Sequence, residues 1–151
     1  MSRKKRVLFV TESHKLASGF GTYAKQVLGR LHATGKYELA EFASYGIPEH
    51  GDNVGWTFFA NAPVSDDERP TYDAHPANHF GYWRFDKVVL SFKPDIVITY
   101  RDPWMDNWIS DSPMRDFFHW VWMPTVDSAP QKREWLETFA DCDALFTYSE
   151  F

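Results

Sequence analysis

Short apolar-rich runs alternate with helical patterns along the chain, and this alternation predicts an α/β fold. The apolar-rich runs, whose length is typical of buried strands, occupy 7–11, 37–43, 95–100, 119–123 and 144–148. Segments with apolar residues at three- and four-residue steps, which predict amphipathic helices, occupy 22–31, 80–92 and 130–140. Gly35 is placed to end the first helix, and Pro130 falls in the first turn of the last.

The middle of the chain is less regular. Residues 56–59 form a candidate third strand, but Pro63 and Pro70 interrupt any regular pattern after it. We interpret 61–78 as a long surface excursion and 101–114 as a loop with one short helix.

Strands that alternate with helices predict a doubly wound, mainly parallel Rossmann-like sheet in one domain spanning 1–151. The sequence stops directly after the last predicted strand, where a complete domain normally adds a covering helix. We therefore interpret the chain as part of a larger protein.

Composition and charge argue against several classes of protein. Basic residues number 16 and acidic residues 21, for a net charge of -5, which argues against a nucleic-acid-binding surface. The single cysteine, Cys142, excludes an internal disulfide and a multi-cysteine zinc site. The apolar run after the basic residues 3–6 is too short for a signal peptide, and no stretch is long enough to span a membrane. We expect a cytoplasmic protein without an integral membrane segment.

Polar residues gather where the predicted strands end. They form the groups Glu12-Ser13-His14, Ser44-Tyr45, Tyr100-Arg101-Asp102 and Thr125-Val126-Asp127-Ser128. Because ligands of open α/β sheets bind at the carboxyl ends of the strands, we expect the binding site there.

The loop from Gly19 to Ala24 matches the dinucleotide fingerprint G-x-G-x-x-A. Its spacing argues against a dinucleotide, because residues 12–18 separate it from the strand and the second strand ends near Ser44 without an acidic residue. Two alternatives remain: a phosphate site at the positive end of the helix, and a simple turn into the helix.

Other motifs favour structural roles. Asp141-Cys142-Asp143 spells the metal-binding pattern D-x-D, but it precedes a strand and is typical of a helix-to-strand turn. His75 and His79 have helical spacing, yet Pro76 lies between them and no third metal ligand is apparent. His119, beside a strand, is expected to pack.

The tryptophans divide into two pairs. Trp120 and Trp122 belong to a buried strand and are predicted to lie in the core. Trp104 and Trp108 lie in a predicted loop, where contact with a sugar or base and packing in the core are both open.

Taken in order, the motifs resemble family 4 glycosyltransferases. The segment RVLFVTESHKLASGFGTYAKQVLGRL resembles the opening strand, glycine loop and helix of that family. FKPDIVITY and the tail MPTVDSAPQKREWLETFADCDALFTYSEF are similar to later strands and turns of its first domain. Residues 49–92 are not diagnostic.

The resemblance implies the N-terminal, acceptor-side half of a GT-B fold, in which two Rossmann-like domains face each other. It implies retaining transfer of a sugar from a nucleotide sugar to an acceptor, without a metal or other cofactor. By this resemblance the donor diphosphate approaches Gly19, Gly21 and Ser128, and Asp127 touches the transferred sugar. We expect the acceptor near Glu12, His14, Arg101, Asp102 and Trp104.

Two departures from the family pattern stand out. The family often has adjacent glycines where this chain has Gly19-Phe20-Gly21, and the C-terminal donor domain is absent. We therefore expect the chain to be inactive without a donor domain or partner chain. A non-catalytic module that binds a sugar or phosphate is the alternative, and a nucleotide-dependent oxidoreductase is a further rival.

Overall fold

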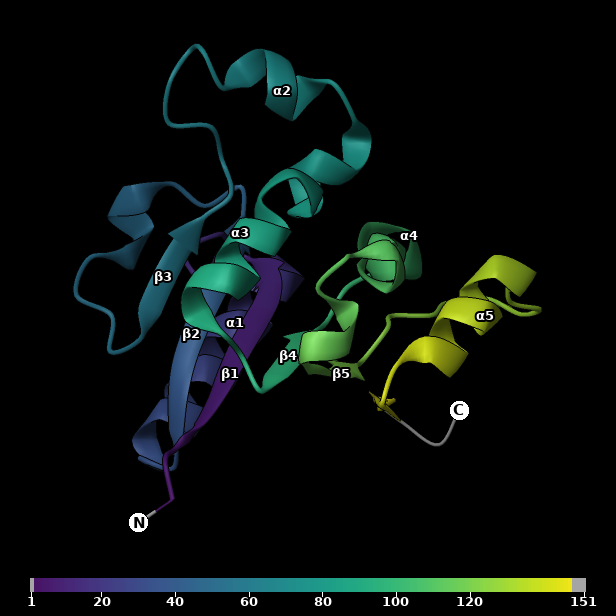
Figure 1. The fold of residues 1–151 in the computed structure, drawn as a ribbon, viewed down its shortest axis with the longest axis horizontal. Helices are drawn as coiled ribbons and strands as arrows, with labels where there is room; N and C mark the ends of the chain where they lie inside the picture. Colours follow the sequence, from purple (N-terminus) through teal and green to yellow (C-terminus); the bar gives the residue numbers. More distant parts are fainter. Residues whose placement is uncertain (1, 148–151) are drawn as a thin grey trace.

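The structure is a computed structural model that describes residues 2–147 and is built on a parallel β-sheet. The sheet has six strands in the order β3-β2-β1-β4-β5-β6. The strands are β1 (Lys5–Glu12), β2 (Tyr37–Ser44), β3 (Thr57–Ala60), β4 (Ile96–Thr99), β5 (His119–Trp122) and β6 (Ala144–Leu145). The chain runs from β1 outward to β3, crosses back to β4 and continues outward to β6 (Figure 1). This topology confirms the predicted doubly wound, Rossmann-like α/β fold.

Helices connect the strands and cover both faces of the sheet (Figure 1). The α-helices are α1 (Gly19–Ala33), α2 (Arg69–Asp73), α3 (Tyr82–Phe92), α4 (Pro103–Asp106) and α5 (Arg133–Asp141). Short 3-10 helices are η1 (Pro48–Gly51), η2 (Pro76–Phe80), η3 (Asn107–Asp111) and η4 (Arg115–Phe117). Within residues 2–147, no helix combines the length and apolarity that crossing a bilayer requires.

The alternation of side chains along β1 creates two cores, one on each face of the sheet. Leu8 and Val10 join the larger cluster under α3, which also contains Trp120 and Trp122. Val7 and Phe9 join the cluster under α1. Trp120 and Trp122 are fully buried, as predicted for a strand covered on both faces.

Several boundaries differ from the sequence prediction. α5 begins at Arg133 instead of 130, and β6 comprises only Ala144–Leu145; Tyr148, which was predicted to end that strand, lies outside the described residues. The prediction that His119 packs was wrong: its side chain is 77% exposed, because it begins β5 at the sheet margin.

The predicted surface excursion 61–78 is more anchored than its composition indicated. It contains α2, and Asn61 is fully buried. The Asn61 side-chain amide donates to the carbonyl groups of Asn78 and His79, both at 2.9 Å. Trp83 is half-buried and donates its indole N–H to the Asn61 side-chain oxygen at 2.8 Å. Buried amide hydrogen bonds therefore hold this segment on the domain.

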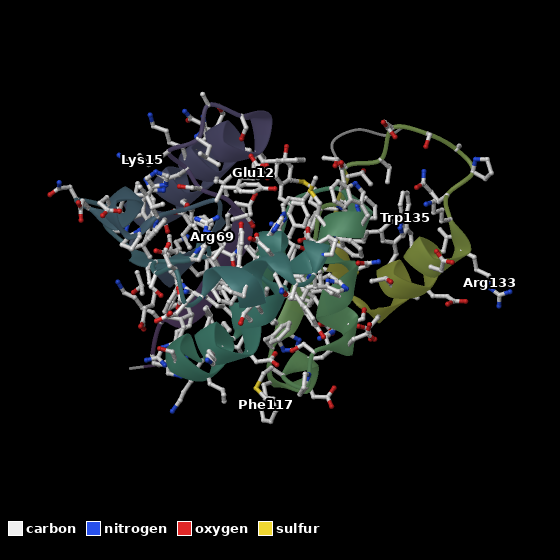
Figure 2. All side chains as sticks on the ribbon, turned by 90° about the horizontal axis from the view of Figure 1, so that it is seen from above. Glu12, Lys15, Arg69, Phe117, Arg133 and Trp135 are labelled. Carbon is white, nitrogen blue, oxygen red and sulfur yellow. The ribbon has the colours of Figure 1, made fainter. Side chains whose placement is uncertain are left out.

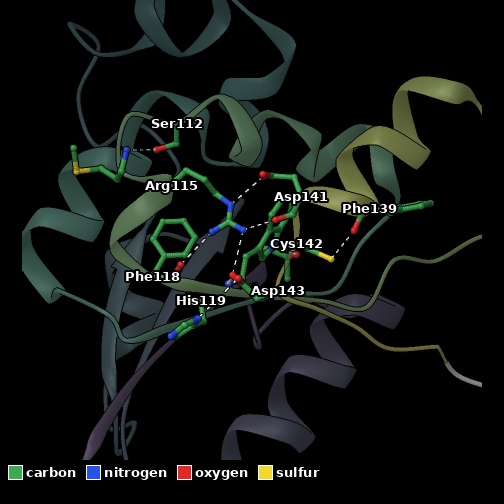
Figure 3. A network of polar contacts seen from close by, with 11 residues as sticks. Ser112, Arg115, Phe118, His119, Phe139, Asp141, Cys142 and Asp143 are labelled. Atoms are coloured by element: carbon green, nitrogen blue, oxygen red, sulfur yellow. Dashed lines mark hydrogen bonds and ion pairs between the residues drawn. The ribbon is translucent and has the colours of Figure 1, made fainter.

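The amino ends of β5 and β6 are joined by a network around Arg115 (Figure 3). Its guanidinium group forms ion pairs with Asp141 at 3.0 Å and Asp143 at 3.2 Å. Asp143 also accepts a 2.7 Å hydrogen bond from the backbone N–H of Trp120. The D-x-D sequence is thus a helix-to-strand turn, as predicted.

We predict that Asp143→Asn lowers the free energy of unfolding by about 1 kcal/mol at pH 7, because it weakens a charge-assisted contact at a partly exposed site. The Trp120 N–H and then Arg115 lower the pKa of Asp143 in the folded state. Its stabilisation is therefore present above the unfolded pKa of about 4 and is lost as the pH falls through the lower folded value.

Urea unfolding at pH 7 and at decreasing pH measures this difference. Asp67→Asn, at an exposed turn, is the matched control. An undiminished difference between wild type and Asp143→Asn at the lowest pH would contradict the assignment.

Candidate functional site

The direction of the chain reverses between β1 and β4, and this is where open α/β sheets bind ligands. The carboxyl ends of β1, β2 and β4 lie side by side here, and we call this side of the sheet the carboxyl edge. A backbone hydrogen bond from Ser13 to Ser44 (3.1 Å) joins the first two ends. Seen from above, Glu12 lies near α1, whereas α5, with Trp135 and Arg133, lies on the far side (Figure 2).

The glycine loop forms a tight turn into α1, capped by Ser18. The Ser18 hydroxyl accepts a 3.0 Å hydrogen bond from the Gly21 N–H and donates to the Glu12 carboxylate. A Cβ atom at Gly21 would lie 2.5 Å from the carbonyl oxygen of Leu16, so only glycine fits there. Gly19 is exposed and has no neighbour within 4 Å of such an atom. Gly21 is therefore required by packing, which sequence spacing alone did not show.

Two backbone donors at the start of α1 remain available. Within the described chain, the N–H groups of Gly19 and Phe20 donate to no acceptor, while the Gly21 N–H is used by the cap. These groups form the positive end of a 15-residue helix. The Glu12 carboxylate, held by Ser18, is the negative group next to this turn.

Arg101 lies beneath the carboxyl edge, and its side chain is 0% exposed. Its guanidinium group pairs with Asp106, donates to the Ser44 hydroxyl at 2.6 Å and donates to the Phe80 carbonyl at 3.0 Å. Burial raises the pKa of Asp106, and the Arg101 charge opposes that rise. Arg101 thus joins the end of β2, η2 and α4 from below instead of presenting its charge to solvent.

His14 is also held beneath the surface, by a residue that the sequence analysis missed. Glu41, in the middle of β2, is fully buried. Its carboxylate lies 2.7 Å from His14 Nδ1 and accepts 2.9 Å hydrogen bonds from the His14 backbone N–H and the Trp56 indole. A glutamate within an apolar strand was the only sequence signal for this network.

A row of three aromatic rings crosses the carboxyl edge. Phe80, which is buried, stands edge-on to Tyr45 at 6.2 Å and to Trp104 at 5.1 Å between ring centroids. The two outer rings are exposed, Tyr45 by 41% and Trp104 by 51%. We call Tyr45, Phe80 and Trp104 the aromatic row.

The backbone at Tyr45 is left-handed, with φ of 57°. Residues other than glycine rarely adopt this conformation, and such residues are enriched at functional sites. Burial raises the pKa of Tyr45, and the nearby Glu12 charge adds to the increase. The Tyr45 hydroxyl therefore stays protonated beside Glu12.

The remaining predicted residues follow β4 and β5. The Asp102 carboxylate accepts a hydrogen bond from the Thr125 hydroxyl, and the Thr125 N–H donates to the Arg101 carbonyl at 3.2 Å. Asp127 is exposed, and in the described part of the chain no hydrogen bond or ion pair holds its carboxylate. Ser128 is also exposed and accepts through its carbonyl from Gln131.

Packing decides between the roles that the sequence left open for Trp104, Trp108, His75 and His79. Trp108 is 7% exposed and belongs to the core, so only Trp104 presents its ring to solvent. His75 Nδ1 accepts from the Ala77 N–H, and His79 stacks on Tyr72 at 4.5 Å. Among residues 2–147, no three His, Cys, Asp or Glu side chains are grouped so that they could hold a metal ion.

No family model and no curated protein matches this chain. What the site does must therefore be inferred from its geometry and chemistry.

The packing of the glycine turn leads to opposite expectations for two glycines of α1. We predict that Gly21→Ala lowers the free energy of unfolding by about 1–3 kcal/mol, because its Cβ collides with backbone oxygens. Gly29→Ala, at an exposed position with free space around it, should raise it by about 0.5–1 kcal/mol. Chemical denaturation of both variants measures the pair, and equal effects would refute the role of Gly21.

The Arg101–Asp106 ion pair should be essential to the carboxyl edge. We predict that Asp106→Asn lowers the free energy of unfolding by about 3–5 kcal/mol, because a buried guanidinium charge loses its counter-charge. Asp116→Asn, at an exposed position, should change stability little. A thermal unfolding curve in which the two variants coincide would show that Arg101 is not held in this way.

Proposed function

We propose that this chain is the acceptor-side domain of a GT-B glycosyltransferase, which transfers a sugar from a nucleotide sugar when a donor domain faces it. One observation carries the proposal. The reversal point of the sheet places the free N–H groups of Gly19 and Phe20 at the same edge as the half-exposed rings of Tyr45 and Trp104. The anion donors suit the diphosphate of a nucleotide sugar, and the stacking surfaces at the same edge suit the sugar ring of an acceptor.

The proposed chemistry assigns distinct roles to these groups. The N–H groups at the start of α1 stabilise the negative charge that develops on the diphosphate as it leaves. Gly21 shapes this turn, and Ser128 contacts the same substrate from the segment after β5. Asp127 orients a hydroxyl of the transferred sugar or stabilises positive charge at its anomeric carbon.

The acceptor lies along the other side of the edge in this proposal. Trp104 stacks on it, and the carboxylates of Glu12 and Asp102 accept its hydroxyl hydrogens. Arg101 and His14 are positioning residues, because both are buried and act through Ser44, Asp106 and Glu41. No metal or other cofactor enters this scheme.

A non-catalytic module that binds a sugar or phosphate is the second candidate. It is favoured by the exposure of Asp127, whose carboxylate no neighbour in the described chain orients. Preorganised groups are what a catalytic site requires, whereas a binding module needs only the rings and the helix terminus.

Titration of the ¹⁵N-labelled chain with UDP-glucose and GDP-mannose tests the proposal. We expect weak binding, with amide shifts concentrated at Gly19 and Phe20. Glu12→Gln should strengthen binding about three- to tenfold, because it removes a negative charge beside the diphosphate. Glu49→Gln, an exposed carboxylate on η1, is the matched control.

Three outcomes discriminate between the candidates. Shifts with inorganic phosphate equal to those with the nucleotide sugars would favour the phosphate-binding module. Tighter binding of NAD than of either nucleotide sugar would favour an oxidoreductase. Absence of shifts at α1 with every probe would refute both proposals for this helix terminus.

A further inference from the structure

A second feature lies beyond Trp104, outside the roles assigned above. A pocket of about 670 Å³ opens between η2, the α4–η3 segment and α5. Its volume falls in the range of small-molecule sites. We call it the side pocket. Trp104 and Phe80 belong to both the aromatic row and this pocket, so the two are continuous.

The wall contributed by α5 is polar. Glu134, Glu137, Thr138 and Asp141 line the pocket and recur at the spacing of one helical face. An amphipathic helix normally turns its apolar face inward and its polar face to water. α5 follows this rule at Phe139, which packs on Trp122 at 4.9 Å between ring centroids, and its solvent-facing polar side borders the open pocket.

The charge of the pocket is negative. Its lining contains four carboxylates, with Asp111 facing the α5 group from η3, and no Lys or Arg. Asp141 is paired with Arg115, and Glu137 forms an exposed pair with Arg133 at 3.0 Å. Within residues 2–147, the carboxylates of Glu134 and Asp111 form no ion pair or hydrogen bond.

One histidine also belongs to the lining. His75 Nδ1 accepts a 3.1 Å hydrogen bond from the Ala77 N–H, so this nitrogen has a backbone partner. In addition, the Ser110 hydroxyl oxygen is buried at the pocket and has no partner in the described chain.

Trp104 contributes an aromatic surface to the side pocket. The Trp104 ring stands at 88° to Phe80, and the Trp104 side chain is 51% exposed. Indole faces pack on the C–H faces of sugar rings and attract cations. Carboxylates beside such a ring form charge-assisted hydrogen bonds with ammonium groups.

We infer that the side pocket binds a saccharide that carries protonated amino groups, with a sugar ring on Trp104 and an ammonium group between Glu134 and Asp111. A neutral sugar uses the ring but leaves the two carboxylates unused. A linear polyamine uses the carboxylates but has no sugar ring to pack on the indole face. That this saccharide is the acceptor of the transfer rests on the proposed function, whereas its binding does not.

Calorimetry and Trp fluorescence on the full chain test the inference with three probes and no nucleotide present. The probes are the fully deacetylated glucosamine trimer, its triacetylated form and spermidine. We expect the deacetylated trimer to bind at least tenfold more tightly than either of the others, because only it combines a sugar ring for Trp104 with ammonium groups for the carboxylates. Equal binding of the acetylated trimer or of spermidine would overturn the inference.

Variants locate the binding. Glu134→Gln, at an exposed helical position, should weaken binding of the deacetylated trimer about tenfold and leave the acetylated trimer unchanged. Trp104→Ala should weaken binding of both trimers. Glu49→Gln is the charge-matched control outside the pocket, and an effect equal to that of Glu134→Gln would overturn the assignment to this site.

Binding of the deacetylated trimer and binding of nucleotide sugars are measured independently. If the deacetylated trimer fails to bind while nucleotide sugars shift Gly19 and Phe20, the pocket assignment is wrong and the transferase proposal stands. If the trimer binds through Glu134 and no nucleotide sugar perturbs α1, the pocket assignment stands and the transferase proposal fails.

Discussion

The buried guanidinium group of Arg101 is the constraint on which the carboxyl edge depends. A charge that is fully removed from water is tolerated only when other groups pair with it and bond to it. Asp106 supplies the counter-charge, while the Ser44 hydroxyl and the Phe80 carbonyl each accept a further hydrogen bond. Because these partners come from α4, β2 and η2, one side chain holds three separate segments in register. Arg101 therefore also positions Phe80, the central ring of the aromatic row.

The two sides of the sheet are built for different tasks. At the amino ends, Arg115 and Asp143 join neighbouring elements and satisfy a backbone donor of β5. At the carboxyl ends, charged groups are either buried beneath the surface or placed beside free donors and exposed rings. The first arrangement stabilises the sheet. The second leaves groups available to a ligand, which agrees with the general position of sites in open α/β folds.

The positive end of α1 and the negative Glu12 carboxylate lie next to each other. Helix termini attract anions, yet Glu12 reaches the same turn through Ser18. The carboxylate stabilises the cap in the free protein and opposes an anion that approaches it. Such a balance favours weak, reversible binding of anions at this helix terminus.

The sequence alone determined the parallel α/β architecture, the buried pair Trp120 and Trp122, and the polar strand ends that gather at one edge. These depend on periodicity and on which residues follow each strand, which are local properties. Tertiary structure decided that Arg101 is buried while Trp104 is exposed, because their neighbours come from segments distant in the chain. It also assembled the side pocket from residues of η2, η3 and α5, whose approach no local pattern encodes.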